Sequence, residues 1–270
     1  MEMALSEPMK NLQRDNHFLP TCYQRGFADE HGKVWVKAAG KPEPQHRKAG
    51  KVGKQRNFYI RTLNGVQNDD VESFFGKAVE DGFANVSRKI RVECQKIDLS
   101  GTELGLLARF VAAQTVRTEA HRRCVDEQAG RPIERDAYLN VMIRQLWTIT
   151  KAWGDSLPNF QFLTTLPYIT HRFITGDCPV MVFASKQNAI LTPTIEAVQA
   201  ITALPDLLDS PQTQFLLTLS PYIAVSLGQL GPSAPQTQLV PLDPIGVLKL
   251  NQHIRDQSQL FTLARDKESL

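Results

Sequence analysis

The residues best suited to chemistry lie along one predicted helix. Spacings of three, four, three and four residues place five side chains on one face: Leu107, Phe110, Gln114, Arg117 and His121. The first two are apolar and should face the core, whereas the last three carry an amide, a guanidinium and an imidazole. A guanidinium on a face directed at the core needs a partner, because burying it unpaired costs several kcal/mol.

Two interpretations of this polar face remain open. In the first, the helix lines a pocket in which Arg117 holds a phosphate or carboxylate through its planar fork, with Gln114 and His121 as further ligand-binding residues. In the second, Arg117 forms an internal salt bridge, and the candidate partners are Glu72, Glu80 and Asp177. Glu72 and Glu80 are eight residues apart, which predicts a shared helix face. That face is either a divalent-metal site or, more simply, an exposed acidic surface.

His17 and Asp177 are the candidate catalytic residues. A histidine titrates near neutrality and can act as a base, an acid or a metal ligand, although a histidine beside aromatic residues is more often structural. Asp177 stands in the turn Thr175-Gly176-Asp177-Cys178-Pro179 between two predicted strands. There its carboxylate either takes a proton from His17 or binds a cation, or it caps the turn through backbone amides.

Positive charge is concentrated in one segment of the chain. Nine basic residues lie between Lys33 and Arg61, against the single acid Glu43, whereas the whole chain has a net charge of +3. A local excess of this kind is typical of a surface that meets phosphates. The candidate nucleic-acid-binding residues are Lys48, Lys51, Lys54 and Arg56. The alternative is a solvated loop that its lysines keep soluble.

Several function classes are disfavoured by what the sequence lacks. It contains no P-loop, no dinucleotide-binding glycine motif, no zinc-protease helix motif and no nucleophile elbow. No two histidines have metal-ligand spacing on one helix, so no metal site, cofactor or protein partner is specified. The cysteines are far apart: Cys22, Cys94, Cys124 and Cys178. We therefore expect reduced thiols in the cytoplasm, no secretory signal and no membrane-spanning helix.

The order of the predicted elements indicates an α+β fold. A strand over 33–37 is followed by a mobile basic loop over about 38–54. Three helices follow, over 71–90 with Asp69 and Glu72 as a capping box, over 101–123 with Ser100 and Glu103 in the same relation, and over 132–153 with Pro132 in its first turn. Short strands come next, over 171–174, 180–183, 215–219 and 222–227. A last helix over 245–256, capped by Asp243, and a strand over 259–264 end the chain. We expect a single domain over 1–270, with a central helical block packed against a mostly antiparallel sheet.

Short motifs in a fixed order resemble one bacterial family. The motifs are Asn16-His17-Phe18-Leu19-Pro20 with Tyr23, Arg25 and Phe27, then Asn57-Phe58-Tyr59, the pair Glu72 and Glu80, Gln114 with Arg117-Thr118, the run from Phe173 to Val180, and Leu219-Ser220-Pro221. Together they resemble domain of unknown function 4238, from about residue 16 to the C-terminus. Gly176 and Cys178 stand where that family has Ser and Asn. The resemblance implies one family domain and no assigned activity, and its first motif adds Arg25 to the candidate ligand-binding residues.

Two functional hypotheses follow from these observations. The first is a nucleic-acid- or nucleotide-acting enzyme, of phosphodiester hydrolase type, in a bacterial defence or toxin system. His17 and Asp177 would transfer protons there, Gln114 and Arg117 would orient a phosphate, and the basic segment would supply affinity. The second is a non-catalytic binding or regulatory module in which the polar residues form a buried structural network.

Overall fold

The first part of the chain forms short strands joined by turns. The structure, a computed structural model, describes residues 12–63, 65–92, 97–155, 158–165, 170–183, 213–228 and 237–270. The elements of the first part are β1 (Asp15–His17), α1 (Thr21–Gln24), η1 (Arg25–Phe27), β2 (Lys33–Ala38), β3 (Gln45–Lys48), β4 (Lys54–Arg56), β5 (Arg61–Leu63) and β6 (Val66–Asn68). Strand β3 lies inside the segment predicted as a loop, where it pairs with β2.

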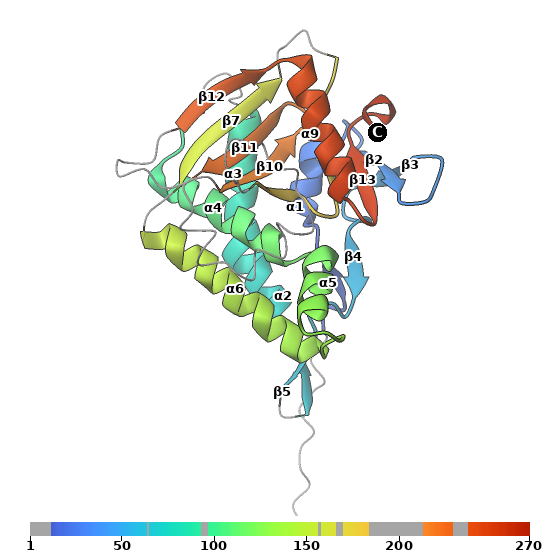
Figure 1. Ribbon diagram of the computed structural model, residues 1–270, viewed down its shortest axis with the longest axis vertical. Helices are drawn as coiled ribbons and strands as arrows, with labels where there is room; N and C mark the ends of the chain where they lie inside the picture. Colours follow the sequence, from blue (N-terminus) through green and yellow to red (C-terminus); the bar gives the residue numbers. More distant parts are fainter. Residues whose placement is uncertain are drawn as a thin grey trace, which may run out of the picture.

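A helical block follows, and most of it lies below the largest sheet in Figure 1. Its elements are α2 (Asp70–Phe74), the π-helical turn η2 (Phe75–Glu80), α3 (Asp81–Val92), α4 (Gly101–Val116), α5 (Glu119–Gln128) and α6 (Arg135–Asp155). Helix α4 packs against α3, α6 and β9, so it is the centre of the block. The predicted capping box at its start is confirmed, because Ser100 and Glu103 bond each other's backbone amides.

The last part of the chain supplies all five strands of the largest sheet. Its elements are β7 (Asn159–Thr165), β8 (Thr175–Gly176), β9 (Val180–Phe183), β10 (Gln214–Ser220), β11 (Ile223–Gly228), β12 (Thr237–Leu242), α9 (Pro244–Gln257), β13 (Phe261–Ala264) and η4 (Lys267–Ser269). The predicted cap of α9 is confirmed, since Asp243 Oδ1 accepts a hydrogen bond from Gly246 N at 2.7 Å.

Two larger sheets join distant parts of the sequence. The five-stranded sheet has the order β12-β7-β11-β10-β9, and all its pairs are antiparallel except β12 with β7. The four-stranded sheet has the order β3-β2-β13-β8, so the end of the chain pairs with its beginning. Two small antiparallel pairs, β1 with β4 and β5 with β6, are the other paired strands among the described residues. The architecture is α+β, as the sequence predicts.

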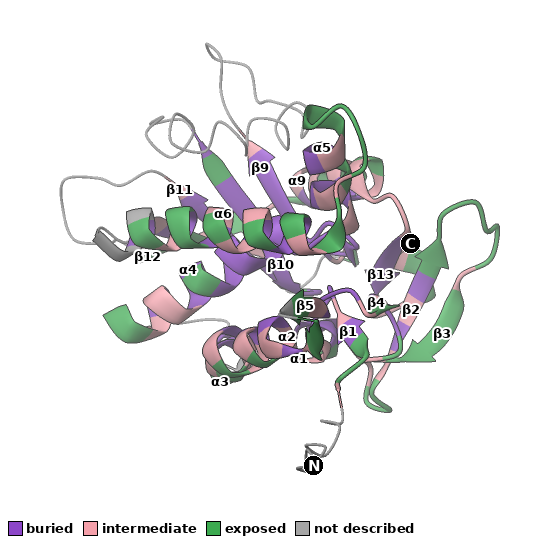
Figure 2. Cartoon of the chain, turned by 90° about the horizontal axis from the view of Figure 1, so that it is seen from below, coloured by how far each residue is buried: buried purple, intermediate pink, exposed green. Residues whose placement is uncertain are grey.

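One large hydrophobic core connects the helical block with both ends of the chain. It includes Phe18 from the first loop, Phe83 and Phe110 from the helices, and Leu217 and Leu263 from the two larger sheets. A smaller core, with Phe173, Met181 and Val247 among its members, lies under α9. In Figure 2 the purple, buried parts of the helices and strands face one another, and the green, exposed parts face outward.

The helix predicted over 101–123 is in fact two helices. Helix α4 ends at Val116, and Thr118 begins α5 by accepting a hydrogen bond from His121 N at 3.1 Å. Threonine side chains compete for backbone N–H groups in this way and favour helix starts over helix interiors. The chain therefore changes direction between Val116 and Glu119. The prediction that one helix face carries Leu107, Phe110, Gln114, Arg117 and His121 is wrong.

Three other local predictions differ from the structure. Asp69 makes no capping bond, and its carboxylate instead accepts a hydrogen bond from Gln13 N. Helix α6 begins at Arg135 rather than near Pro132. Ile133 N instead donates a hydrogen bond of 2.8 Å to Asp126 Oδ1, which keeps this segment in a loop. Residues 171–174 form no strand; Asn251, from α9, bonds the backbone of Ile174 and of Arg172 instead.

Candidate functional site

Arg117 lies at the centre of a buried polar group that we call the Arg117 cluster: His17, Tyr59, Glu72, Glu80 and Arg117. The Arg117 side chain is 0% exposed. Its Nη1 donates to Glu80 Oε1 at 2.8 Å, its Nε donates to Tyr59 Oη at 2.9 Å, and its Nη2 donates to the backbone oxygen of His17. The guanidinium carbon also lies 4.2 Å from the centre of the Phe75 ring, a cation–π contact.

The π-helical turn η2 brings the two glutamates to the same side of their helix. In a regular α-helix each residue advances by about 100°, so eight residues would place Glu80 about 80° away from Glu72. A π turn absorbs one extra residue, which reduces the offset to about 20°. Both carboxyl groups therefore act electrostatically on Arg117, and the prediction of an exposed acidic face is wrong.

The two glutamates of the cluster differ in their electrostatic state. Burial raises the pKa of Glu72 to about 7, because the attraction of Arg117 is outweighed by desolvation and by the repulsion of Glu80. Glu72 Oε2 is buried and has no hydrogen-bond partner among the described residues. Glu80 keeps the ion pair with Arg117, and its side chain is 23% exposed. The cluster thus contains one closed ion pair and one carboxyl group that gains a proton near neutrality.

His17 contributes its backbone, rather than its ring, to the Arg117 cluster. The ring Nε2 lies 2.9 Å from the backbone oxygen of Gly50, on the side of β4 and the loop before it. The backbone carbonyl of His17 accepts the bond from Arg117. The two residues are therefore neighbours, but the imidazole is not directed at the guanidinium.

Asp177 fastens the β8–β9 turn to the last strand. Its Oδ1 accepts hydrogen bonds from Gln259 N at 3.0 Å and from Phe261 N at 3.3 Å. Burial raises the pKa of the Asp177 carboxyl group, and the backbone hydrogen bonds oppose that rise. Within the described ranges no hydrogen bond or ion pair joins Asp177 to His17. Both amides belong to the segment at the start of β13 rather than to the turn itself, so the carboxylate links the turn to a distant strand.

The remaining ligand-binding candidates share no hydrogen bond or ion pair with one another within the described residues. Gln114 is 0% exposed, and neither its Oε1 nor its Nε2 has a partner in the described part of the chain. His121 is buried between Gln145 Oε1, at 2.6 Å from Nε2, and Tyr138 Oη, at 3.2 Å from Nδ1. Burial lowers the pKa of His121 to about 4, so its ring is neutral at pH 7. Arg25 is exposed at the start of η1.

A separate pocket of about 540 Å³ lies where the basic segment meets α5. We call it the basic pocket. Its floor is apolar and includes Phe18, Val36, Val52 and Phe261. Its charged lining residues are Lys41, Arg47, Lys51, Lys54 and Arg123, against Glu43 and Glu119. Five cations against two acids make the pocket positive.

Several charges of the basic pocket are already paired. Lys54 Nζ lies 2.8 Å from Asp15 Oδ2, and Glu43 Oε2 lies 3.3 Å from Lys267 Nζ. Arg47 has no ion pair either, but its guanidinium donates to Gln45 Oε1. Lys41, Lys51 and Arg123 have neither an ion pair nor a side-chain hydrogen bond within the described residues, so three cations remain for a ligand. Glu119 Oε2 is buried and unpartnered among the same residues.

The structure divides the predicted nucleic-acid-binding residues into two groups. Lys51 and Lys54 line the basic pocket, whereas Lys48 and Arg56 are exposed outside it. Arg123 and Glu119, from α5, were not predicted as part of this surface. No signal in the sequence could have placed them there, because their position depends on how α5 packs against the strands near the N-terminus.

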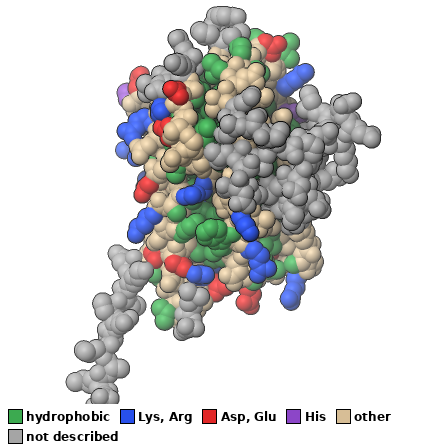
Figure 3. All heavy atoms as spheres, turned by 90° about the vertical axis from the view of Figure 1, so that its left-hand side faces the viewer, with side chains coloured by type: hydrophobic (Ala, Val, Ile, Leu, Met, Phe, Trp, Pro, Cys, Tyr) green, Lys and Arg blue, Asp and Glu red, His purple; other side chains and the backbone are tan. Residues whose placement is uncertain are grey.

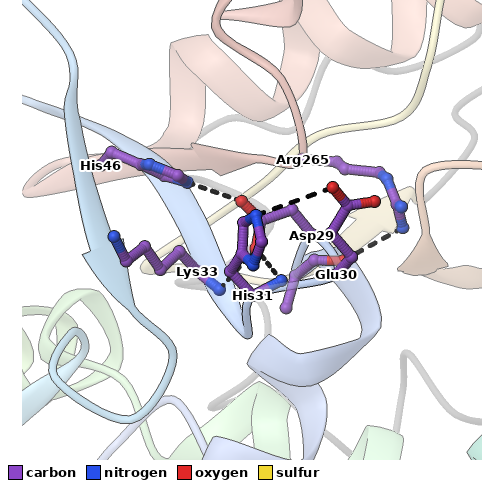
Figure 4. Close-up of polar contacts among 7 residues, drawn as sticks. Asp29, Glu30, His31, Lys33, His46 and Arg265 are labelled. Carbon is purple, nitrogen blue, oxygen red and sulfur yellow. Dashed lines mark hydrogen bonds and ion pairs between the residues drawn. The ribbon is translucent and has the colours of Figure 1, made fainter.

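Strands β2 and β3 border the basic pocket with one face. On their other face, a polar contact between Asp29 and His46 holds them in place. Figure 4 shows Asp29 accepting hydrogen bonds from the backbone of His31 and Lys33 and from the ring of His46, whose Nε2 lies 2.8 Å away. The ring of His46 is stacked on Trp35, with 4.7 Å between their centres. Asp29 therefore ties β2 and β3 to the turn after η1, while the alternate residues Val36, Gln45 and Arg47 face the pocket.

Two further features concern metals and membranes. In the part of the chain that the structure describes, no group of three or more His, Cys, Asp or Glu side chains is arranged to hold a metal ion. Over the same residues, no helix has the length and apolar character needed to cross a bilayer. Cys22, Cys124 and Cys178 are free thiols, and Cys94 lies outside the described residues.

The fold and these sites define an α+β protein with a buried arginine cluster beside a basic pocket. Residues 15–142 match the model of a family described as Protein of unknown function (DUF4238), so the chain resembles that family over this stretch. The match contains every member of the Arg117 cluster, whereas the motifs near Asp177 and Ser220 lie beyond it. No curated protein and no solved structure shows significant similarity to the chain.

Proposed function

We propose that this protein binds a phosphate-bearing ligand, with nucleic acid as the first candidate, in the basic pocket. The observation that carries the proposal is the set of three cations there, Lys41, Lys51 and Arg123, whose side chains have neither an ion pair nor a hydrogen bond within the described residues. Charges left open in a concave site attract anions, and their attraction is strengthened where apolar walls exclude water. The apolar floor supports a ligand that also has a hydrophobic or aromatic part.

The Arg117 cluster is the structural network in this proposal. Its guanidinium is fully buried, paired with Glu80 and bonded to Tyr59 and His17, so its charge is already compensated. A ligand phosphate would have to displace these contacts before it could bind. The alternative of a binding module with a buried polar network therefore fits the contacts better than a catalytic role for Arg117. The free thiols support a cytoplasmic location, where thiols stay reduced.

A second candidate function is phosphodiester hydrolysis in the same pocket, the activity expected of a nucleic-acid-acting enzyme in a defence or toxin system. One observation favours it: the side chain of Glu119 lines the pocket. A carboxylate beside bound phosphate can accept a proton from an attacking water. Glu119→Gln should then abolish cleavage of an oligonucleotide while its binding remains.

The proposed function is tested by binding of a labelled 20-base-pair DNA duplex at low salt, measured by fluorescence anisotropy. Lys51→Ala/Arg123→Ala removes two of the three open cations and should weaken binding by tenfold or more. Lys48→Ala/Arg56→Ala removes the same charge outside the pocket and is the matched control. Equal affinities of the two double variants, or no binding by the wild-type protein, would overturn the proposal.

A further inference from the structure

A second concave surface lies on the helical block, away from the basic pocket. It is a groove of about 690 Å³ lined by residues of α2, η2, α4 and α6, and we call it the Trp147 groove. Phe74, Leu146 and Trp147 supply its apolar surface, and Arg109, Arg144 and Lys151 supply its charges. Helix α6 and strand β3, which borders the basic pocket, lie on opposite sides of the molecule in Figures 1 and 2.

Trp147 is not needed for the core of the protein. The side chain is 62% exposed, so it lies outside the buried stripe of α6. The buried stripe of that helix is Leu139, Met142, Leu146, Ile149 and Trp153, with the spacing of one helix face. Trp153 shows the contrast, since it is 6% exposed and meets Phe215 edge-on. A large aromatic side chain exposed beside other apolar groups is typical of a binding surface.

The charges around the exposed indole all have one sign. Arg144 and Lys151 lie three residues before and four residues after Trp147, so they flank it on the same face of α6. Arg109 reaches the groove from α4 and donates one hydrogen bond to the backbone oxygen of Ala78 at 3.3 Å. The described residues that line the groove include no carboxylate. Figure 3 shows an apolar patch with Lys and Arg side chains beside it on this side of the molecule.

We propose that the Trp147 groove binds single-stranded nucleic acid. An unpaired base stacks on the indole of Trp147, and Arg144, Lys151 and Arg109 contact the phosphates on either side. Every base offers a flat aromatic surface, so stacking with flanking cations binds single strands with little sequence preference. The volume is within the range of pockets that hold small organic ligands, which is the scale of one or two nucleotides. The uniform positive charge favours this occupant over a protein surface of mixed charge.

The test uses a fluorescein-labelled oligothymidylate of ten nucleotides, with anisotropy for affinity and tryptophan emission for contact. We expect the oligonucleotide to quench tryptophan emission in the wild-type protein. Trp147→Ala should weaken binding about tenfold, the loss expected when one base loses its stacking partner. Trp147→Phe keeps an aromatic ring, so it should bind within about threefold of wild type while the quenching disappears. Trp35→Phe, a change at the stacked tryptophan of β2, is the matched control and should keep both signals.

Two further arms distinguish binding in this groove from binding in the basic pocket and from a protein-binding surface. Lys51→Ala/Arg123→Ala alters the basic pocket and should leave the quenching intact, so the groove can be tested even if the proposed function fails. In this same double variant, the sequence as a duplex should bind more weakly than the single strand, because its bases are already stacked. The proposal is overturned if Trp147→Ala binds as wild type, or if the quenching survives in Trp147→Phe. Quenching by an acidic peptide but not by the oligonucleotide would assign the groove to a protein partner instead, and would also overturn it.

Discussion

Arg117 and Glu80 form an ion pair inside the protein, with 2.8 Å between Nη1 and Oε1. The pair links the end of α4 to the π-helical turn η2, and the same guanidinium bonds the backbone of His17 near the N-terminus. Three segments that are distant in the sequence therefore meet at one charged group. This arrangement selects the internal salt bridge from the two interpretations of the polar helix face, and it gives Arg117 a role in holding the fold together.

Removing the guanidinium should destabilise the protein strongly. Arg117→Met keeps most of the aliphatic stem but leaves Glu80 without its partner, which typically costs about 3–5 kcal/mol. We expect a fall of this size in the free energy of unfolding, measured by urea denaturation. Arg122→Met is the matched control, because Arg122 and Asp126 lie 4.0 Å apart in a partly exposed pair of one helix, worth about 0.5 kcal/mol or less. Equal stability of Arg117→Met and wild type would show that the buried charge serves something other than the fold.

Replacing Gln114 should not lower the free energy of unfolding, in contrast to replacing Arg117. Its amide is fully buried, and neither polar atom has a partner among the described residues, so folding removes it from water without compensation. Gln114→Met has nearly the same shape and no such cost. We expect the variant to be as stable as wild type or more stable by about 1 kcal/mol. A loss of more than about 1 kcal/mol in the same urea assay would contradict this expectation and would indicate that the amide has a partner in solution.

His121 should make stability depend on acid pH. Burial lowers its folded-state pKa from 6.5 to about 4, so the unfolded chain takes up a proton first as the pH falls. Between about pH 6.5 and 4 the unfolded state is therefore favoured progressively, by up to about 3 kcal/mol in total. The stability advantage of wild type over His121→Gln should shrink across that window. A difference between the two proteins that stays constant from pH 7 to pH 4 would contradict the buried, neutral ring.

Glu72 should have the reverse pH dependence. Its folded-state pKa is raised from 4.5 to about 7 by burial, so the folded protein holds a proton that the unfolded chain has released. This contribution is fully present below about pH 4.5 and is lost as the pH rises towards 7. Wild type should lose on the order of 2 kcal/mol relative to Glu72→Gln over this range, a figure reduced for the partial exposure of the group. Parallel stability curves for the two proteins would show that Glu72 titrates normally.

The sequence predicted the start of a helix correctly where a single capping side chain determines it. The caps formed by Ser100 with Glu103 and by Asp243 need only residues a turn apart, and both are confirmed. Thr118 is also a residue type that favours a helix start. The spacing of residues on both sides of it nevertheless predicted one continuous helix. At Asp69 the cap competes with a hydrogen bond from Gln13, a contact that depends on how the N-terminal segment folds back.

The candidate sites were less predictable, because they depend on packing between distant segments. Glu80 was one of three possible partners of Arg117, and the choice follows from the π turn that rotates Glu80 towards Glu72. Arg123 reaches the basic pocket only because α5 packs beside the loop that carries Lys51. Trp147 directly follows the buried Leu146, and its own exposure depends on which face of α6 packs against α4.

The most direct test of the proposed function is the salt dependence of DNA binding. On duplex DNA the slope of log affinity against log salt is roughly −0.9 per phosphate contacted, so three open cations predict a slope of about −2.7 for the wild-type protein. Lys51→Ala/Arg123→Ala should flatten that slope by about 1.8, while Lys48→Ala/Arg56→Ala should leave it unchanged. A wild-type slope near zero, or equal flattening by the two pairs of substitutions, would contradict phosphate binding in the basic pocket.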